Sequence, residues 1–295
     1  MNLNRSSIMQ KKIKDLLPEW TTTVQDRSLT LTNDLDSLIS CALLKHLFGY
    51  EINYFYTFNS IMVADKTDKR KSIGVDLALK SGYCYDNHLT MLTAKGYKNE
   101  DAANLNNVLN ISNENYNLKY SFSTLMFLWS LYDVPLPVTD EGRITLLCID
   151  SSYLGYYKHD GRYRQIFIDW MERLNMMELV EVLERYSFGE MEEFNRRHEL
   201  KSTIFVNKRK GNKMDTTIRH SSPYMEQLDF EWISEHLGFL VELPTNQFEI
   251  LGSFTNKEVE HWQMNDKTIN ESFSYAFTYK DKVKLSRLLR EGESA

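Results

Sequence analysis

The stretch SLTLTNDLDSLISCALLKHLFG, residues 28–49, contains a change of hydrophobic period. Residues 27–32 have the alternating composition that is typical of a strand. From Leu35 onwards, apolar side chains recur every three or four positions, which predicts an amphipathic helix over residues 35–48 that ends at Gly49. Two carboxylates, Asp34 and Asp36, lie where the predicted strand passes into the predicted helix.

The segments on the C-terminal side of this helix repeat the strand pattern. Residues 51–58 (EINYFYTF) and the short run 73–77 predict two more strands, joined by the charged connection 65–72. A strand, helix, strand, loop, strand order is typical of an α/β fold, and we expect a parallel sheet flanked by helices.

Further apolar runs extend this core to about residue 200. Residues 121–132 predict a buried helix, residues 144–149 (ITLLCI) predict a buried strand that ends at Asp150, and residues 163–199 predict helices with a break near Gly189. The pattern then changes to short strands at residues 203–206, 239–243, 248–254 and 273–279, with helices at 228–237 and from Asp281. We therefore predict a core domain over residues 1–200 and a smaller α+β domain over residues 201–295.

Composition limits the class of protein. The chain has 295 residues, of which 42% are hydrophobic and 26% are charged, as in a globular protein with a sizeable core. Its net charge of -6 does not favour non-specific binding to duplex DNA. The 3 cysteines are expected to be buried, reduced thiols. We find no signal peptide and no apolar run of about 20 residues, which predicts a cytoplasmic protein without a membrane span.

Acidic residues recur at the predicted carboxyl ends of strands. Asp34 and Asp36 follow the first strand, Asp76 ends the third, and Asp150 ends the run ITLLCI. Because these ends meet in one crevice of an α/β sheet, we expect the four carboxylates to lie together and to bind divalent cations. The alternative for Asp34 or Asp36 is a helix N-cap, and the alternative for Asp76 or Asp150 is a turn residue.

The order of four short motifs resembles a known family. TNDLDSLIS, VDLA, YDNH and CIDSS, read in this order over residues 27–200, resemble the motifs of the DHH phosphoesterase superfamily. That group includes RecJ-type exonucleases, oligoribonucleases and manganese-dependent pyrophosphatases. The resemblance implies a DHH-like core and hydrolysis of a phosphodiester by a metal-activated hydroxide, with Mn²⁺ or Mg²⁺ as cofactor.

The resemblance also implies roles for individual residues. Asp34 would bind a first metal ion, Asp36 and Asp150 a second, and Asp76 would bridge the two. His88, in the Tyr85-Asp-Asn-His motif, would contact phosphate or assist metal binding. The implied substrate is a nucleotide or a short oligonucleotide, and a homodimer is left open.

The chain departs from the family pattern at three places. The family's upstream His or Asp ligand is absent before Asp34, and Asn87 occupies the position of a ligand His. An amide oxygen is a weaker ligand for Mn²⁺ than imidazole is, so one of the two sites could stay empty. The C-terminal part, which resembles the domain that follows the core in relatives, lacks their glycine-rich loop. The alternative function is therefore a catalytically inactive relative that binds a nucleotide, a nucleic acid or a protein partner.

Two basic runs are candidates for contacts with phosphate. One is Lys66, Lys69, Arg70 and Lys71, and the other is Lys208, Arg209, Lys210 and Lys213. The alternative for both is an exposed surface segment.

Overall fold

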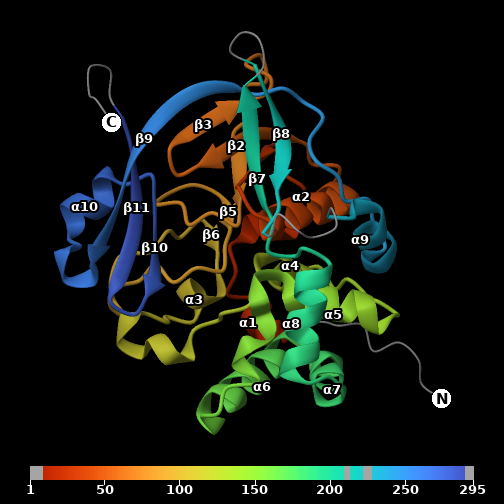
Figure 1. The fold of residues 1–295 in the computed structure, drawn as a ribbon. Helices are drawn as coiled ribbons and strands as arrows, with labels where there is room; N and C mark the ends of the chain where they lie inside the picture. The colour runs from red at the N-terminus through yellow and green to blue at the C-terminus, as the bar shows by residue number, and fades with distance from the viewer. Residues whose placement is uncertain (1–8, 209–212, 222–227, 290–295) are drawn as a thin grey trace.

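The computed structural model describes residues 9–208, 213–221 and 228–289 of the chain. Its main feature is a nine-stranded mixed sheet in the order β10-β11-β9-β3-β2-β1-β4-β5-β6 (Figure 1). The strands of this sheet are β1 (Ser28–Leu31), β2 (Ile52–Thr57), β3 (Ser60–Val63), β4 (Ser72–Val75), β5 (Cys84–Tyr85), β6 (Ala102–Ala103), β9 (Glu249–Glu260), β10 (Ser274–Tyr279) and β11 (Lys282–Leu288).

One half of the sheet is parallel and follows from the opening stretch of sequence. β1 pairs in parallel with β2 and with β4, and the parallel ladder continues through β5 to β6. The connecting helix α2 (Leu35–Phe48) has the predicted bounds. It begins at the N-cap Asp34 and ends at Gly49, whose φ of 72° is the left-handed conformation that glycine adopts without strain. The predicted α/β class and the parallel strands are thereby confirmed.

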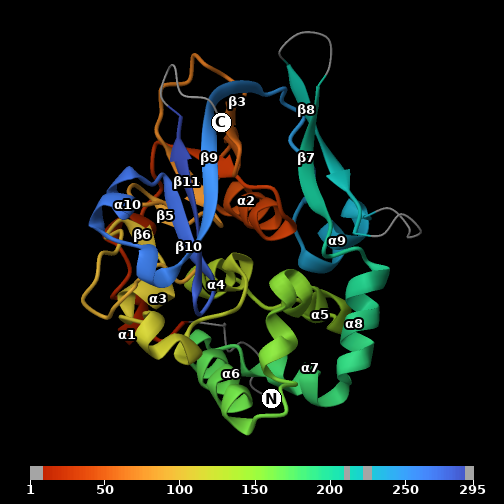
Figure 2. The same ribbon diagram turned by 60° about the vertical axis from the view of Figure 1, so that its left-hand side comes forward.

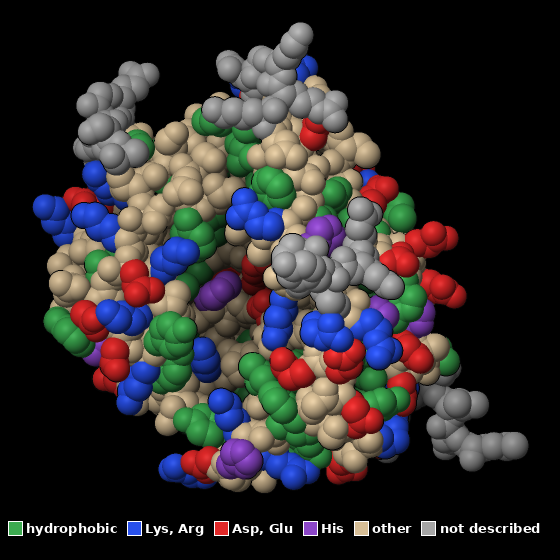
Figure 3. Space-filling view, in the orientation of Figure 1, with side chains coloured by type: hydrophobic (Ala, Val, Ile, Leu, Met, Phe, Trp, Pro, Cys, Tyr) green, Lys and Arg blue, Asp and Glu red, His purple; other side chains and the backbone are tan. Residues whose placement is uncertain are grey.

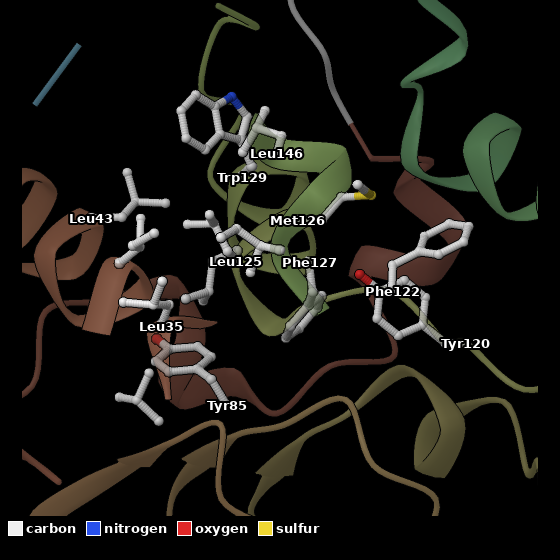
Figure 4. Close-up of a cluster of buried hydrophobic side chains, with 14 of the residues drawn as sticks. Leu35, Leu43, Tyr85, Tyr120, Phe122, Leu125, Met126, Phe127, Trp129 and Leu146 are labelled. Carbon is white, nitrogen blue, oxygen red and sulfur yellow. The ribbon is translucent and has the colours of Figure 1, made fainter. Parts of the chain in front are cut away.

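The helices of the core surround α4 (Thr124–Leu131), the predicted apolar helix, all of whose residues are buried. Figure 4 shows Leu35 and Leu43 of α2 on one side of α4, and Tyr120 and Phe122 on the other. Figures 1 and 2 show α5 (Asp140–Cys148), α6 (Gly161–Leu174), α7 (Met177–Arg185) and α8 (Phe188–Arg197) grouped below the sheet. The other α-helices are α1 (Lys11–Lys14), α3 (Leu105–Val108), α9 (Phe230–Leu237) and α10 (Asp266–Glu271), of which α10 lies next to β10 and β11.

The predicted strand at residues 144–149 is wrong. Residues 144–148 of this run belong to α5, whose N-cap Thr139 accepts a hydrogen bond from the N–H of Gly142. A short apolar run cannot distinguish a buried strand from a buried helix, and here every residue from Ile144 to Cys148 is buried, as in a helix enclosed on all sides. Asp150 therefore does not end a strand.

Two smaller predictions are also corrected. The helix expected from Asp281 is the strand β11, whose side chains alternate between the faces of a hairpin with β10. Residues 239–243 form no strand. The break predicted near Gly189 lies at Tyr186 and Ser187, just before α8, and a further break lies at Asn175. Helix α9 at residues 230–237 agrees with the prediction.

The C-terminal strands extend the sheet of the core. β9 pairs antiparallel with β3, and β11 then joins β9 to β10. A separate two-stranded ribbon, β7 (Thr203–Lys208) and β8 (Met214–Arg219), lies beside the sheet (Figure 2). The division into two domains at residue 200 stays a prediction. Among residues 9–208, 213–221 and 228–289, no helix has the length and apolar character needed to cross a membrane.

Candidate metal centre

The start of α2 positions two of the predicted ligands. The Asp34 carboxylate accepts a hydrogen bond of 2.9 Å from the N–H of Ser37, so the N-cap interpretation is correct for this residue. Asp36, two residues later, is only 1% exposed. Its two oxygens accept hydrogen bonds of 2.6 Å and 2.8 Å from the N–H groups of Thr124 and Leu125, at the start of α4. The N-terminus of α4 therefore holds Asp36 in the interior.

Asp76 follows β4 and is 5% exposed. Its φ of 54° is in the left-handed region, which Asp adopts more readily than most other residues. The hydroxyl of Thr124 donates a hydrogen bond of 2.8 Å to its Oδ1. Thr124 therefore links Asp36 and Asp76, through its backbone N–H and its side chain respectively.

Asp150 reaches the site from an element that the sequence did not predict. It lies where α5 passes into a 3₁₀ helix, Ile149–Gly155, and both Asp150 and Ser151 have φ above 50°. The residue as a whole is exposed, whereas its carboxyl group is directed at the other acids and enclosed by protein. The Asp150 carboxylate thus belongs to a left-handed turn, whereas the sequence predicted that it would lie at the end of a strand.

These side chains converge. One carboxylate oxygen from each of Asp36, Asp76 and Asp150 lies within 4.8 Å of the others. A second group, Asp76, Asp86 and His88, meets the same limit. Asp76 belongs to both groups and therefore lies at the centre of the cluster, and the bridging role that the resemblance implies stays a prediction.

Asp34 is outside both groups but adjoins them. Burial, and then the charge of Asp76, raise the pKa of Asp34 to about 7. Burial and the Asp76 charge likewise raise the pKa of Asp36 well above its usual value. Burial, together with the charge of Asp150, raises the pKa of Asp76 to about 6. Such carboxylates repel one another when ionised, and a bound divalent cation would relieve that repulsion.

Asp86 was not singled out in the sequence as a ligand. It directly follows β5, a strand of two residues that is too short to recognise from its pattern. It is 2% exposed, and its oxygens accept hydrogen bonds of 2.7 Å from His88 Nδ1 and from Asn104 Nδ2. Asn104 also donates to the carbonyl oxygen of His88, so it anchors both residues.

The carboxylates around His88 favour the protonated form of its imidazole. Although burial opposes the charged ring, the neighbouring carboxylates, Asp86 first among them, raise its pKa to about 10. A protonated imidazole donates hydrogen bonds and does not bind a metal ion. Of the two implied roles, the charge agrees better with contact to phosphate.

Asn87 is oriented as a hydrogen-bond donor. Its Nδ2 donates to the carbonyl oxygen of Phe122 at 3.0 Å and to Asp150 at 3.3 Å. Because a carbonyl oxygen can only accept a hydrogen bond, the amide nitrogen of Asn87, and not its oxygen, faces the Phe122 carbonyl. In this orientation the nitrogen of Asn87, and not its oxygen, is directed at Asp150.

The donor set fits a hard divalent cation. The group Asp36, Asp76 and Asp150 offers only carboxylate oxygens, which suit Mg²⁺ and Mn²⁺. The hydroxyl oxygen of Thr32, a residue that lines the cavity over Asp34 and Asp76, is buried and has no hydrogen-bond partner within the described residues. The residues present could therefore hold a metal ion, and nothing in the donor set distinguishes the two metals.

Two adjoining cavities give access to the centre. One, of about 110 Å³, lies over Asp34 and Asp76, and the other, of about 560 Å³, extends past Asn87 and Asp150. Figure 3 shows the hollow from outside, with histidine and acidic side chains within it and lysine and arginine side chains around it. An acidic floor with cationic surroundings suits an anionic ligand that is bound through metal ions.

Thr124→Val is expected to lower the affinity for Mn²⁺ by roughly 10–100-fold, because it removes the hydroxyl that orients Asp76. Titration calorimetry with MnCl₂ measures this. Thr145→Val is a matched control, because Thr145 is also buried in a helix and its hydroxyl donates to the carbonyl of Glu141, away from the acids. Equal Mn²⁺ affinities for the two variants would contradict the role of Thr124.

The remaining sequence predictions lie away from the centre. Lys66 pairs with Glu249 and Arg70 with Asp68, so these members of the first basic run are engaged at the surface. Residues 209–212 of the second run lie outside the described residues. The three cysteines are free and buried, as predicted.

Comparisons with family models, with curated proteins and with solved structures gave no match, so the interpretation of this centre depends on its own geometry.

Proposed function

We propose that the chain is a divergent metal-dependent phosphoesterase of the DHH type that hydrolyses a phosphodiester of a nucleotide or short oligonucleotide. The observation that carries the proposal is the convergence of Asp36, Asp76 and Asp150, each of which places one carboxylate oxygen within 4.8 Å of the others. Residues from β4, β5, α2 and the end of α5 meet there, although they are distant in the sequence.

The protein's own residues have separable tasks in this proposal. Asp36, Asp76 and Asp150 would hold one cation, and Asp34 with Asp76 would offer oxygens to a second. Bound Mn²⁺ or Mg²⁺ would neutralise phosphate charge and supply hydroxide at neutral pH. His88, held by Asp86, would donate a hydrogen bond to a phosphate oxygen from the wall of both cavities.

A second candidate function has an observation in its favour. Asn87 directs its amide nitrogen at Asp150, and both oxygens of Asp36 already accept backbone hydrogen bonds from α4. Such a centre could bind a cation and a nucleotide without activating water. The second candidate is therefore a catalytically inactive relative that binds a nucleotide, a nucleic acid or a protein partner.

Metal-dependent turnover separates the two functions. We expect the purified chain to hydrolyse bis(p-nitrophenyl) phosphate and short RNA when Mn²⁺ is added, and to lose this activity in EDTA. Release of p-nitrophenol and electrophoresis of labelled RNA measure the two reactions. Mn²⁺ binding without turnover of either substrate would favour the inactive relative, and absence of both binding and turnover would exclude the metal centre itself.

A further inference from the structure

The two cavities at the metal centre adjoin one another across a small set of residues. His88, Thr278 and Lys284 line both cavities. One wall comes from the core around His88 and Tyr120, and the facing wall comes from the C-terminal strands β9, β10 and β11. We call this continuous space the groove, and define it by the lining of both cavities. It extends beyond the carboxylates on the side of Asp150.

Lysines are placed along the groove without carboxylate partners. Lys119, Lys257 and Lys284 line its larger part. Within the described part of the chain, none of the three forms an ion pair with a carboxylate. The Nζ of Lys284 lies 3.7 Å from the centre of the Phe58 ring, and Lys119 lies over the Tyr116 ring and contacts its hydroxyl. Aromatic faces attract a cation without neutralising it, so these charges remain available to an anion.

Lys284 is the member that is best placed to act on the ligand. It is half-buried, and it lies on β11 directly opposite Glu258 of β9. Glu258 accepts a hydrogen bond from the hydroxyl of Thr278 and does not pair with Lys284. An ammonium group that is partly removed from water, with its cross-strand acid engaged elsewhere, gains most from an anionic ligand.

We propose, on the basis of the proposed function, that the groove binds a second phosphate of the same substrate strand through Lys284, assisted by Lys119 and Lys257. The substrate class is then a short single-stranded oligonucleotide with a phosphate next to the scissile phosphodiester. A diester with only one phosphate would leave these lysines without a partner.

The size and the aromatic residues of the groove agree with this class. A cavity of about 560 Å³ is in the range that encloses a small ligand. Tyr279, at 70% exposed, lines the same cavity. An exposed aromatic ring is a suitable surface for stacking of a base next to the bound phosphate.

Matched dinucleotides test the proposal. ApA, pApA and ApAp contain the same scissile bond, and only the last two carry a second phosphate. With the Mn²⁺-loaded chain, we expect kcat/KM for the better of the two phosphorylated forms to exceed that for ApA by at least about tenfold. This preference should disappear in Lys284→Met, which keeps the aliphatic stem over Phe58, and should be retained in Lys284→Arg.

The matched control is Lys267→Met, which lies on the exposed surface of α10 and outside the groove and should keep the preference for a second phosphate. Equal rates for all three dinucleotides, or a preference that survives Lys284→Met, would overturn the second phosphate site while leaving the proposed function in place. If no diester is hydrolysed, the proposed function fails. Calorimetric affinities for pApA, ApAp and ApA, measured with the chain and with Lys284→Met, would then decide the phosphate site alone.

Discussion

Asp76→Asn is expected to reduce Mn²⁺-dependent hydrolysis of bis(p-nitrophenyl) phosphate by at least about a thousandfold. The substitution keeps the shape of the side chain, and Asn tolerates the left-handed φ of 54° that Asp76 adopts. It removes one of the three carboxylates, Asp36, Asp76 and Asp150, that would hold a cation. Loss of several kcal/mol of metal-dependent stabilisation of the transition state, about 4 kcal/mol for three orders of magnitude, accounts for the size of the effect.

The same substitution should not destabilise the metal-free fold. Burial and the neighbouring Asp150 disfavour ionised Asp76, so a neutral amide removes a repulsive charge and should raise the melting temperature in EDTA. A loss of activity together with a gain in apoprotein stability would distinguish a functional carboxylate from a structural one.

Asp133→Asn is a suitable control for Asp76→Asn. Asp133 also has a φ of 54°, but it pairs with Lys14 and lies outside both acidic groups. Its variant should keep hydrolysis close to that of the unmodified chain. Activity of the Asp76 variant within tenfold of that level would place the chemistry at another site.

The stability of the metal-free chain should fall as the pH rises from 5.5 to 8. Asp34 and Asp76 have an ordinary pKa of 3.8 and folded values of about 7 and about 6. A carboxyl group whose pKa is raised by folding contributes stability at low pH and loses it as the pH rises through the folded pKa. His88, with a folded pKa of about 10 against an ordinary 6.5, acts in the same direction over this window.

The expected size follows from the two aspartates. Their combined linkage between pH 5.5 and 8 is about 3 kcal/mol, which corresponds to a decrease in melting temperature of about 5 °C. Surface carboxylates with lowered pKa values, such as Asp68 and Glu249, lose their contribution only at more acidic pH and do not mask this trend. Differential scanning calorimetry in EDTA across this range measures it.

Added Mn²⁺ should reverse this pH dependence. The cation binds the ionised carboxylates, so metal binding stabilises the chain more at pH 8 than at pH 5.5. The melting temperature at pH 8 should therefore rise most when MnCl₂ replaces EDTA. A melting temperature in EDTA that is constant, or that increases from pH 5.5 to 8, would show that folding does not raise the pKa values of the clustered carboxylates.

Local signals in the sequence predicted the elements that have strong periodicity. Helix α2 was predicted at residues 35–48, and β1, β2 and β4 were predicted close to their observed bounds. Alternation, helical spacing, an N-cap Asp34 and a C-terminal Gly49 all agree in that part of the chain. The joint placement of Asp36 and Asp76 followed from parallel strand ends.

Other elements carried no decisive local signal. Residues 144–149 are apolar throughout, and only packing against the other helices selects α5 over a strand. Residues 282–288 alternate weakly, and pairing with β9 and β10 makes them a strand. Asp86 was missed because β5 has only two residues. Asp150 was expected beside the other carboxylates at the end of a strand, and it lies beside them in a left-handed turn.

The sequence by itself determined the α/β class, the first helix and the acidic character of the site, because hydrophobic period and end-capping residues act over a few neighbouring positions. The tertiary structure alone decided that Asp150 lies in a left-handed turn, that Asn87 donates to it, and that Lys284 and His88 line the same groove. Those placements depend on contacts between segments up to about two hundred residues apart, where packing and pairing outweigh local preference.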